Sequence, residues 1–133
     1  MTQVLQPLGW AKPKGFSNGI AASGRMVFVA GQIAFNSENI IQEKTFAGQF
    51  RQTLKNTIAV LAEAGAKPEH IVRMTWYILD KREYLGAIRE VGAAYRELIG
   101  RHYPAMAVVQ VSGLVEDQAK LEIETTAVIP ATP

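Results

Sequence analysis

Two glutamates near the end of the chain are the residues whose type and spacing best suit catalysis. Glu122 and Glu124 alternate with apolar residues in a strand-like segment, so their side chains point to the same face. A carboxylate at a cleft can hold a water molecule and serve as a general base or proton shuttle in hydrolysis. The alternative is that both glutamates face solvent on an amphipathic strand, and the spacing alone leaves both interpretations open.

Few other residues are of a type that could serve in catalysis or ligand binding. His70 and His102 are far apart in the sequence, and we expect both at the surface; His102 precedes a strand, where a functional role is the alternative. Gly31 and Gln32 follow an apolar strand, where a glycine either lets a ligand approach the backbone or forms a bulge. With no cysteine and no Walker, dinucleotide-binding, HExxH or GxSxG motif, we expect neither a metal site nor a cofactor.

The composition limits the classes of protein. The 133 residues are 48% hydrophobic, which suits a single domain over residues 1–133 with a core of its own. Scattered basic residues and a net charge of +2 argue against a nucleic-acid surface. No segment reaches the ~20 apolar residues of a membrane span, so we expect a soluble, cytoplasmic protein. The large aromatic residues fit a core or an interface better than a base-stacking platform; they include Trp10, Phe16, Trp76 and Tyr103.

The first part of the chain is irregular and then strand-like. Residues 1–18 are rich in proline and glycine, which predicts a leading loop. Residues 19–22 and 26–30 are apolar and flank the turn pair Ser23-Gly24. This pattern predicts a β-hairpin.

Two segments have the apolar period of a helix. The first follows Thr45, a good N-cap residue, and ends at Gly65. The second follows Asp80, whose spacing to Glu83 suits a capping box, and ends at Gly100. We expect one continuous helix in each segment.

Three more strand-like segments occur at residues 71–79, 105–111 and 121–129. Together with the predicted hairpin and the two predicted helices, they give the order β-β-α-β-α-β-β. We therefore expect an α+β fold, a mixed sheet with two helices on one face. Several strands are apolar on consecutive positions, so both faces of the sheet must be buried. The second face then needs another copy of the chain, which predicts a homo-oligomer with sites between subunits.

A series of short motifs runs along the chain: Gly15-Phe16-Ser17, residues 27–33, Gln49 with Asn56, residues 61–66, Tyr103-Pro104-Ala105 and residues 121–124. In this order and spacing they resemble the signatures of the Rid/YjgF family, also labelled endoribonuclease L-PSP, over roughly residues 13–129. The resemblance implies a chorismate-mutase-like (YjgF-like) fold. It also implies a homotrimer around a central barrel of sheets, with clefts for a small-molecule ligand between subunits.

In its best-understood branch, this family hydrolyses reactive enamines and imines, such as 2-aminoacrylate, to 2-oxoacids and ammonia. The resemblance implies that Glu122 is the catalytic residue that positions the water. It also assigns a set of residues to the ligand cleft: Phe16, Ser17, Gly31, Gln32, Gly92, Tyr103 and Met106. Two of these depart from the deaminating members, which carry a substrate-binding arginine where Met106 stands and a tyrosine where Phe16 stands. Gly92 replaces a small polar residue of some family clefts.

The change at Met106 has the larger consequence. A guanidinium forms a bidentate pair with a carboxylate that a thioether cannot imitate, and losing such a partner costs about 2–5 kcal/mol. Met106 instead offers an apolar wall for a larger or less charged ligand. Arg25 or Arg101 of a neighbouring subunit could replace the clamp, and no spacing argument selects either.

The leading hypothesis is therefore an enzyme, a cofactor-free imine or enamine hydrolase that does not act as a typical 2-aminoacrylate deaminase. The alternative is a non-catalytic trimer that binds a small metabolite in the same cleft. RNA cleavage or translation inhibition is a third hypothesis, suggested mainly by the older family label.

Overall fold

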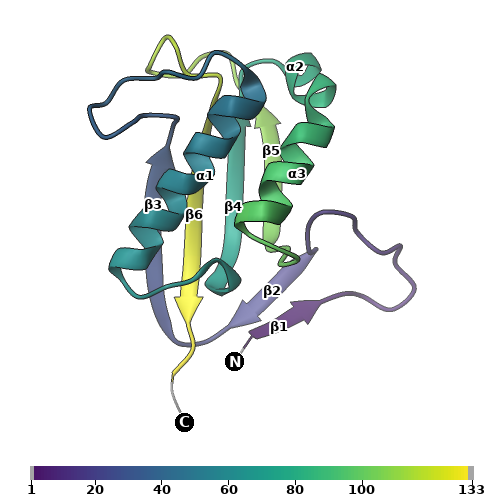
Figure 1. The fold of residues 1–133 in the computed structure, drawn as a ribbon. Helices are drawn as coiled ribbons and strands as arrows, with labels where there is room; N and C mark the ends of the chain where they lie inside the picture. The colour runs from purple at the N-terminus through teal and green to yellow at the C-terminus, as the bar shows by residue number, and fades with distance from the viewer. Residues whose placement is uncertain (1, 132–133) are drawn as a thin grey trace.

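A four-stranded sheet forms the centre of the molecule, in the order β3-β6-β4-β5 (Figure 1). The computed structural model describes residues 2–131. The strands are β3 (Arg25–Gln32), β4 (Ile71–Ile78), β5 (Ala105–Gln110) and β6 (Leu121–Ile129). Strand β6 is antiparallel to both of its neighbours, whereas β4 and β5 are parallel. The sheet is therefore mixed, and the predicted α+β fold is confirmed.

The helices pack on one face of this sheet (Figure 1), as the sequence predicts. They are α1 (Phe46–Glu63), the short η1 (Pro68–His70), α2 (Lys81–Gly86) and α3 (Ile88–Leu98). The apolar stripe of α1 is buried, and Phe50 meets Trp76 of β4 edge to face at 4.8 Å between ring centroids. Thr45 accepts a hydrogen bond from the Gly48 N–H at 3.0 Å, which confirms the predicted N-cap.

The second predicted helix is two helices, α2 and α3, because the chain departs from helical geometry at Ala87. Gly86, a poor helix former, immediately precedes the break. Asp80 caps α2 by accepting from the Arg82 N–H at 2.9 Å. The predicted capping box is wrong, since the Glu83 carboxylate instead accepts from the Lys120 ammonium at 2.8 Å.

The predicted hairpin between residues 19–22 and 26–30 is also wrong. Strand β2 (Gly19–Ala22) pairs with β1 (Thr2–Leu5), which lies inside the segment predicted as a leading loop, and β3 pairs with β6. Gly24 has φ +144°, and a Cβ there would lie 2.1 Å from the Ile129 carbonyl oxygen. Gly24 therefore allows the chain to pass close to the end of β6 rather than turn back on β2.

The sheet face opposite the helices is open in the single chain. Phe28 is 71% exposed on this face, and Met26 and Val109 are exposed as well. Exposed apolar side chains of this size on one sheet face are typical of an interaction surface. Within residues 2–131, no helix is long and apolar enough to cross a membrane.

Gln49 ties α1 to two loops from the buried side of the helix. Its side chain is 2% exposed, donates to the carbonyls of Glu43 and Gln118 at 3.1 and 3.0 Å, and accepts from the Lys120 N–H at 2.8 Å. All three partners are backbone groups of segments without regular structure of their own. One buried amide therefore supplies hydrogen bonds that these loops cannot supply to each other.

We predict that Gln49→Leu lowers the free energy of unfolding by about 3 kcal/mol, because three backbone groups lose their partner on the buried side of α1. Urea denaturation at a fixed protein concentration measures this change. The matched control is Gln52→Leu, which removes one side-chain hydrogen bond, to Asn56, and should cost less than about 1 kcal/mol. Equal denaturation midpoints for the two variants would contradict the role given to Gln49.

Candidate functional site

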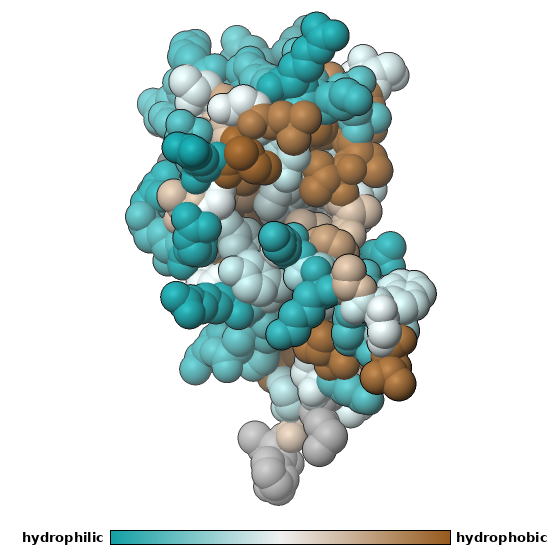
Figure 2. All heavy atoms as spheres, turned by 90° about the vertical axis from the view of Figure 1, so that its right-hand side faces the viewer, coloured by the Kyte–Doolittle hydropathy of each residue, from teal (hydrophilic) through white to brown (hydrophobic). Residues whose placement is uncertain are grey.

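A cavity of about 570 Å³ lies between α3, the strands β4 and β5, and the N-terminal loop. Figure 2 views the side of the molecule that is on the right in Figure 1, where α3 and β5 lie, and shows hydrophobic side chains gathered beside a hollow on this face. Ile88 of α3 is one of the exposed apolar residues at this cavity. We call this space the Met106 cavity, after the residue of β5 that lines it.

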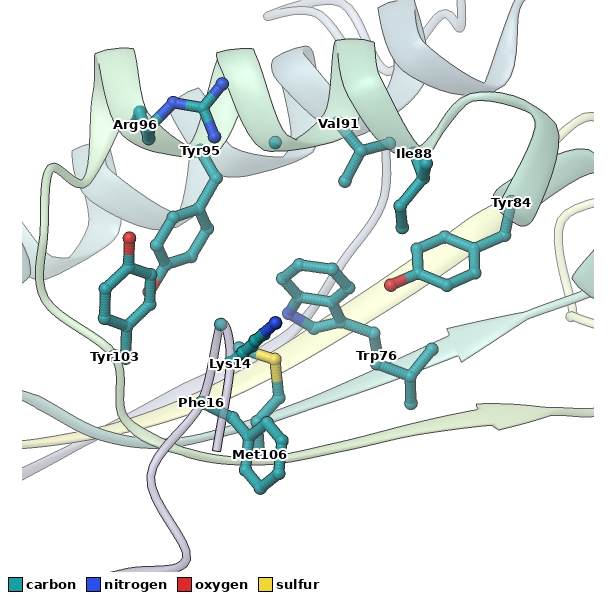
Figure 3. Close-up of a pocket in the computed structure, with 13 residues that line it drawn as sticks. Lys14, Phe16, Trp76, Tyr84, Ile88, Val91, Tyr95, Arg96, Tyr103 and Met106 are labelled. Carbon is teal, nitrogen blue, oxygen red and sulfur yellow. The ribbon is translucent and has the colours of Figure 1, made fainter. Parts of the chain in front are cut away.

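Aromatic rings form much of the wall of the Met106 cavity (Figure 3). Tyr95 and Tyr103 stack at 5.8 Å with an interplanar angle of 9°, and Trp76 meets Tyr84 edge to face at 6.4 Å. The Tyr95 hydroxyl donates to the His102 carbonyl at 2.5 Å, which holds the stacked pair in place. Burial raises the pKa of Tyr95 and of Tyr84, so both hydroxyls are protonated at neutral pH.

Trp76 is the one aromatic residue of the wall with a buried polar atom that lacks a partner among the described residues. The side chain is 5% exposed, yet its Nε1–H has no acceptor. In Figure 3 this nitrogen faces the side of the cavity on which Met106 and Lys14 lie. A buried N–H without a partner is rare and costs about 1–3 kcal/mol.

The N-terminal loop closes one side of the cavity because Ser17 fastens it to the start of β5. The Ser17 hydroxyl donates to the Tyr103 carbonyl at 2.5 Å, and its N–H donates to the Pro104 carbonyl at 3.0 Å. Ser17 is buried, whereas the preceding Phe16 lies against the cavity and is 38% exposed. Gly15 takes φ +80°, a conformation that favours glycine and turns the loop toward the cavity.

The strand register explains why Met106 faces this cavity. Met106 lies directly opposite Met74, and Val108 lies opposite Trp76. Met74 and Trp76 are buried on the helix side of β4, and directly paired residues share a face of the sheet. Met106 and Val108 therefore point toward α3 and give this part of the cavity an apolar surface.

The charged residues that line the cavity are Arg96 and Lys14. Neither forms an ion pair or a side-chain hydrogen bond within residues 2–131. The guanidinium of Arg96 lies over Gly92, one turn earlier in α3, where an added Cβ would be 3.2 Å from Arg96 Nη1. Glycine in a helix costs about 1 kcal/mol relative to alanine, and here it leaves room for the guanidinium beside the cavity.

Glu122 lies on the other face of the sheet. It is opposite Tyr77 in the register, whereas its neighbours Leu121 and Ile123 are buried in the core. Its carboxylate lies against Gly31, where an added Cβ would be 2.0 Å from Glu122 Oε2. Gly31 falls within the bulge of β3 between Val29 and Gln32, so the bulge and the missing side chain together make room for the carboxylate.

Glu124 shares the open face with Glu122 but has a partner. The Tyr77 hydroxyl donates to Glu124 Oε1 at 2.5 Å, and this hydrogen bond raises the pKa of Tyr77. No side-chain hydrogen bond occupies the Glu122 carboxylate within the described residues. Of the two glutamates, Glu122 is thus the one whose carboxylate has no side-chain hydrogen bond among the described residues.

The residues expected in the cleft fall into two groups. Phe16, Gly92, Tyr103 and Met106 line the cavity, with Ser17 directly behind it. The other group, on β3 and β6, consists of Glu122, Gly31 and Gln32. The Gln32 side chain donates to the carbonyl of Ala30 at 3.1 Å and does not line the cavity.

Neither of the arginines suggested as a replacement clamp lines the cavity of its own chain. Arg25 donates to the Ala64 carbonyl at 2.6 Å, and Arg101 follows α3 outside the cavity lining. The sequence prediction missed Arg96, Lys14 and Tyr84 as lining residues. The one available signal was the spacing of Arg96 four residues after Gly92, which places both on one face of a helix.

His102 lies partly at the surface, between full exposure and burial. Its ring is partly buried, and its Nε2–H donates to the Ile71 carbonyl at 2.6 Å, so it connects the loop before β5 to the start of β4. His70 lies in the turn η1, where its Nδ1 accepts from the Lys67 N–H at 3.0 Å. No cluster of three or more potential metal-ligating side chains occurs in the described part of the chain.

The sequence comparisons agree on one family. A model of the family described as endoribonuclease L-PSP matches residues 11–129. The 2-iminobutanoate/2-iminopropanoate deaminase of Escherichia coli K12 is 33% identical over 79% of this chain and 80% of its own. A RutC family protein of Pyrococcus horikoshii is 30% identical over 96% of this chain and 98% of its own. This chain belongs to the Rid/YjgF family.

Solved structures share the fold of this chain. The Rid protein YyfB of Yersinia pestis, whose function is described as unknown, superposes with a TM-score of 0.83 at 31% identity, covering 96% of this chain and 98% of its own. TdcF of Escherichia coli, solved with bound serine, gives a TM-score of 0.67 at 31% identity over 91% of each chain. The mixed sheet with helices on one face is thus the Rid fold.

We predict that Gly31→Ala in this Rid protein displaces the Glu122 carboxylate, because the new methyl group would occupy its place. The carboxylate is the end of a flexible side chain, so the free energy of unfolding should fall by no more than about 1 kcal/mol. A crystal structure of the variant, with a thermal melt, tests both parts. Gly113→Ala is the control, since no heavy atom lies within 4 Å of its added Cβ. An unmoved Glu122 would contradict the prediction.

Proposed function

We propose that this Rid protein hydrolyses the C=N bond of a small reactive imine, or of the enamine that tautomerises to it. Water adds to the imine carbon and gives a carbinolamine, which then expels ammonia and leaves a carbonyl group. The Glu122 carboxylate accepts a proton from the attacking water and returns it to the nitrogen as ammonia leaves. The reaction consumes one water, releases one ammonia and needs no redox partner.

The observation that carries this proposal is the position of Glu122. Its carboxylate is held against the bulge at Gly31 and is free of side-chain partners among the described residues, whereas Glu124 two residues later is occupied by Tyr77. A relative that is 33% identical is named as a deaminase of 2-iminobutanoate and 2-iminopropanoate. A positioned carboxylate and water are the main requirements of imine hydrolysis.

In this proposal the cleft is completed by a second copy of the chain. Met106 and Glu122 lie on opposite faces of one sheet, so the cavity and the carboxylate of a single chain cannot act on the same atom. They can meet where the β5 edge of one copy, which borders its cavity, adjoins the open sheet face of another. The apolar residues of the open face, among them Phe28, Met26 and Val109, support such an association. We propose a homotrimer in which the open faces form a central barrel.

The substrate is expected to differ from 2-aminoacrylate. Met106 supplies apolar surface in the cavity at the position where the resemblance implies an arginine, Val108 adds to that surface, and Phe16 supplies a ring without a hydroxyl. These residues favour a ligand with a larger apolar part than an iminopropanoate has. Turnover of 2-iminopropanoate should therefore be detectable but slow.

We predict that Glu122→Gln lowers the enzyme-dependent hydrolysis of 2-iminopropanoate by about 100-fold or more, because general-base catalysis is lost while the shape is kept. The imine is generated in the assay by an amino-acid oxidase acting on alanine, and its lifetime is followed by competition with semicarbazide. Glu124→Gln is the matched control on the same strand and face, and it should retain most of the activity.

Equal rates for Glu122→Gln and the unaltered protein would rule out the role of Glu122. A ligand bound in the Met106 cavity with no turnover of small or bulky imines would instead support the non-catalytic, metabolite-binding alternative.

The composite cleft predicts complementation between two inactive variants. Met106→Trp fills the cavity, and Glu122→Gln removes the base. When equal amounts of the two chains are co-refolded, about a quarter of the clefts combine an open cavity with an intact carboxylate, and activity should return in that proportion. Each variant refolded alone is the control. Absence of any recovery in proven mixed oligomers would contradict the composite cleft.

A further inference from the structure

The Glu122 carboxylate rests on an irregular part of β3. The pairing of β3 with β6 is interrupted between Val29 and Gln32, and Glu122 lies against Gly31 inside this bulge. A bulge leaves backbone groups outside the ladder of hydrogen bonds, so the paired strands alone do not fix its shape. The position of the carboxylate therefore depends on what holds the chain at the far end of the bulge.

Asn56 of α1 holds the chain directly after β3. Helix α1 packs over β3 and β6 (Figure 1), and the Asn56 side chain points to the segment that leaves β3. Its Nδ2 group donates to the Ile33 carbonyl at 2.9 Å and to the Phe35 carbonyl at 2.8 Å. Its Oδ1 accepts from the Gln52 side chain at 2.9 Å, which fixes the orientation of the amide. Both protons of one amide nitrogen are thus used on the backbone after the bulge.

The segment that Asn56 holds, residues 33–41, is closed by bonds of its own. The Asn36 N–H donates to the Ile40 carbonyl at 2.9 Å, and the Asn36 side chain accepts from the Ile40 N–H at 3.0 Å. Ala34 is 2% exposed and belongs to a small apolar cluster apart from the main core. A segment closed in this way moves as a unit, so the bonds from Asn56 decide where the end of β3 lies relative to α1.

We infer that Asn56 is a positioning residue for the Glu122 carboxylate. Asn56 belongs to the helix layer and Glu122 to the open face of the sheet, so Asn56 acts through the backbone of β3. With both carbonyls held, Gln32 stays paired with Ile123, and the bulge keeps the room at Gly31 that the carboxylate occupies. This inference rests on the proposed function, because it concerns the group that activates water there.

Asn56→Asp tests the inference directly. The change keeps the shape and the acceptor for Gln52, but both donors are lost. We expect kcat for 2-iminopropanoate to fall about 10-fold, because a misplacement of about 1 Å can cost up to about 100-fold in rate. KM should change by less than about twofold, since Asn56 does not line the Met106 cavity.

Thr57→Ala is the matched control for a loss of stability. Thr57 is the next residue of α1, is fully buried, and donates only to the Thr53 carbonyl within the helix. The variant should lower the free energy of unfolding and leave kcat unchanged, because no bond to residues 33–41 is lost. An equal fall of kcat in both variants, or none in Asn56→Asp, would overturn the inference.

Coupling to Glu122 distinguishes positioning from a general effect on the fold. If Asn56 acts through Glu122, Asn56→Asp should cause no further loss of kcat in the Glu122→Gln background. Losses that multiply in the double variant would overturn the inference. If Asn56→Asp does not fold, Asn56→Ser retains one donor and should show a smaller loss with the same coupling.

Hydrogen exchange reports on the bulge without any turnover. We expect the amides of residues 31–35 to exchange about 10-fold faster in Asn56→Asp, because the end of β3 opens locally more often. Thr57→Ala should leave their local exchange unchanged. A crystal structure of Asn56→Asp should show the Glu122 carboxylate displaced from Gly31. Unchanged exchange together with an unmoved carboxylate would overturn the inference.

These measurements separate the inference from the proposed function. Equal hydrolysis by Glu122→Gln and the unaltered protein would refute the hydrolase, while a displaced carboxylate in Asn56→Asp would still show that Asn56 places it. An inactive Glu122→Gln, combined with normal kcat and an unmoved carboxylate in Asn56→Asp, would do the reverse.

Discussion

Side chains along a strand point alternately to the two faces of the sheet, and here helices cover only one of those faces. This alternation decides which residues of the molecule lie together. Residues of β4 alternate between the helix side, where Trp76 packs, and the open side, where Tyr77 lies. Residues paired across neighbouring strands share a face of the sheet. Val108 of β5 therefore lies on the helix side with Trp76, and Glu122 of β6 lies on the open side with Tyr77. A shift of β5 by one residue would turn Met106 out of the cavity and put the residues of the opposite face into its lining.

The Met106 cavity exists because the helices do not cover β5 completely. Helix α1 packs with a continuous apolar stripe, whereas α3 has a glycine at position 92 and begins only after the break at Ala87. The stacked pair of Tyr95 and Tyr103 supports this gap from one end, and the loop fastened by Ser17 limits it from another. The site is thus built largely from residues that also belong to the core, which keeps its walls in place without a ligand.

The sequence predicts the parts of this fold that depend on local pattern. The buried stripe of α1, the caps at Thr45 and Asp80, and the ends at Gly65 and Gly100 follow from residue type and spacing. The hairpin prediction failed because a Ser-Gly turn pair also suits a close approach to a distant strand, and the pairing of β3 with β6 joins segments about a hundred residues apart.

In the candidate site, Glu122 and Met106 were recognisable as separate residues, but their placement on opposite faces of the sheet requires knowledge of the strand register. Arg96 was missed because a single arginine on an amphipathic helix ordinarily faces solvent.

The separation of Met106 and Glu122 by the thickness of one sheet has a consequence for how such a protein can diverge. The residues that line the Met106 cavity belong to β4, β5, α2, α3 and the N-terminal loop, whereas the position of the carboxylate depends on the bulge of β3 and on β6. A substitution in one group therefore leaves the contacts of the other intact within its own chain. Selection can reshape the cavity in small steps while the surroundings of the Glu122 carboxylate stay unchanged, so the two parts of one scaffold can diverge separately.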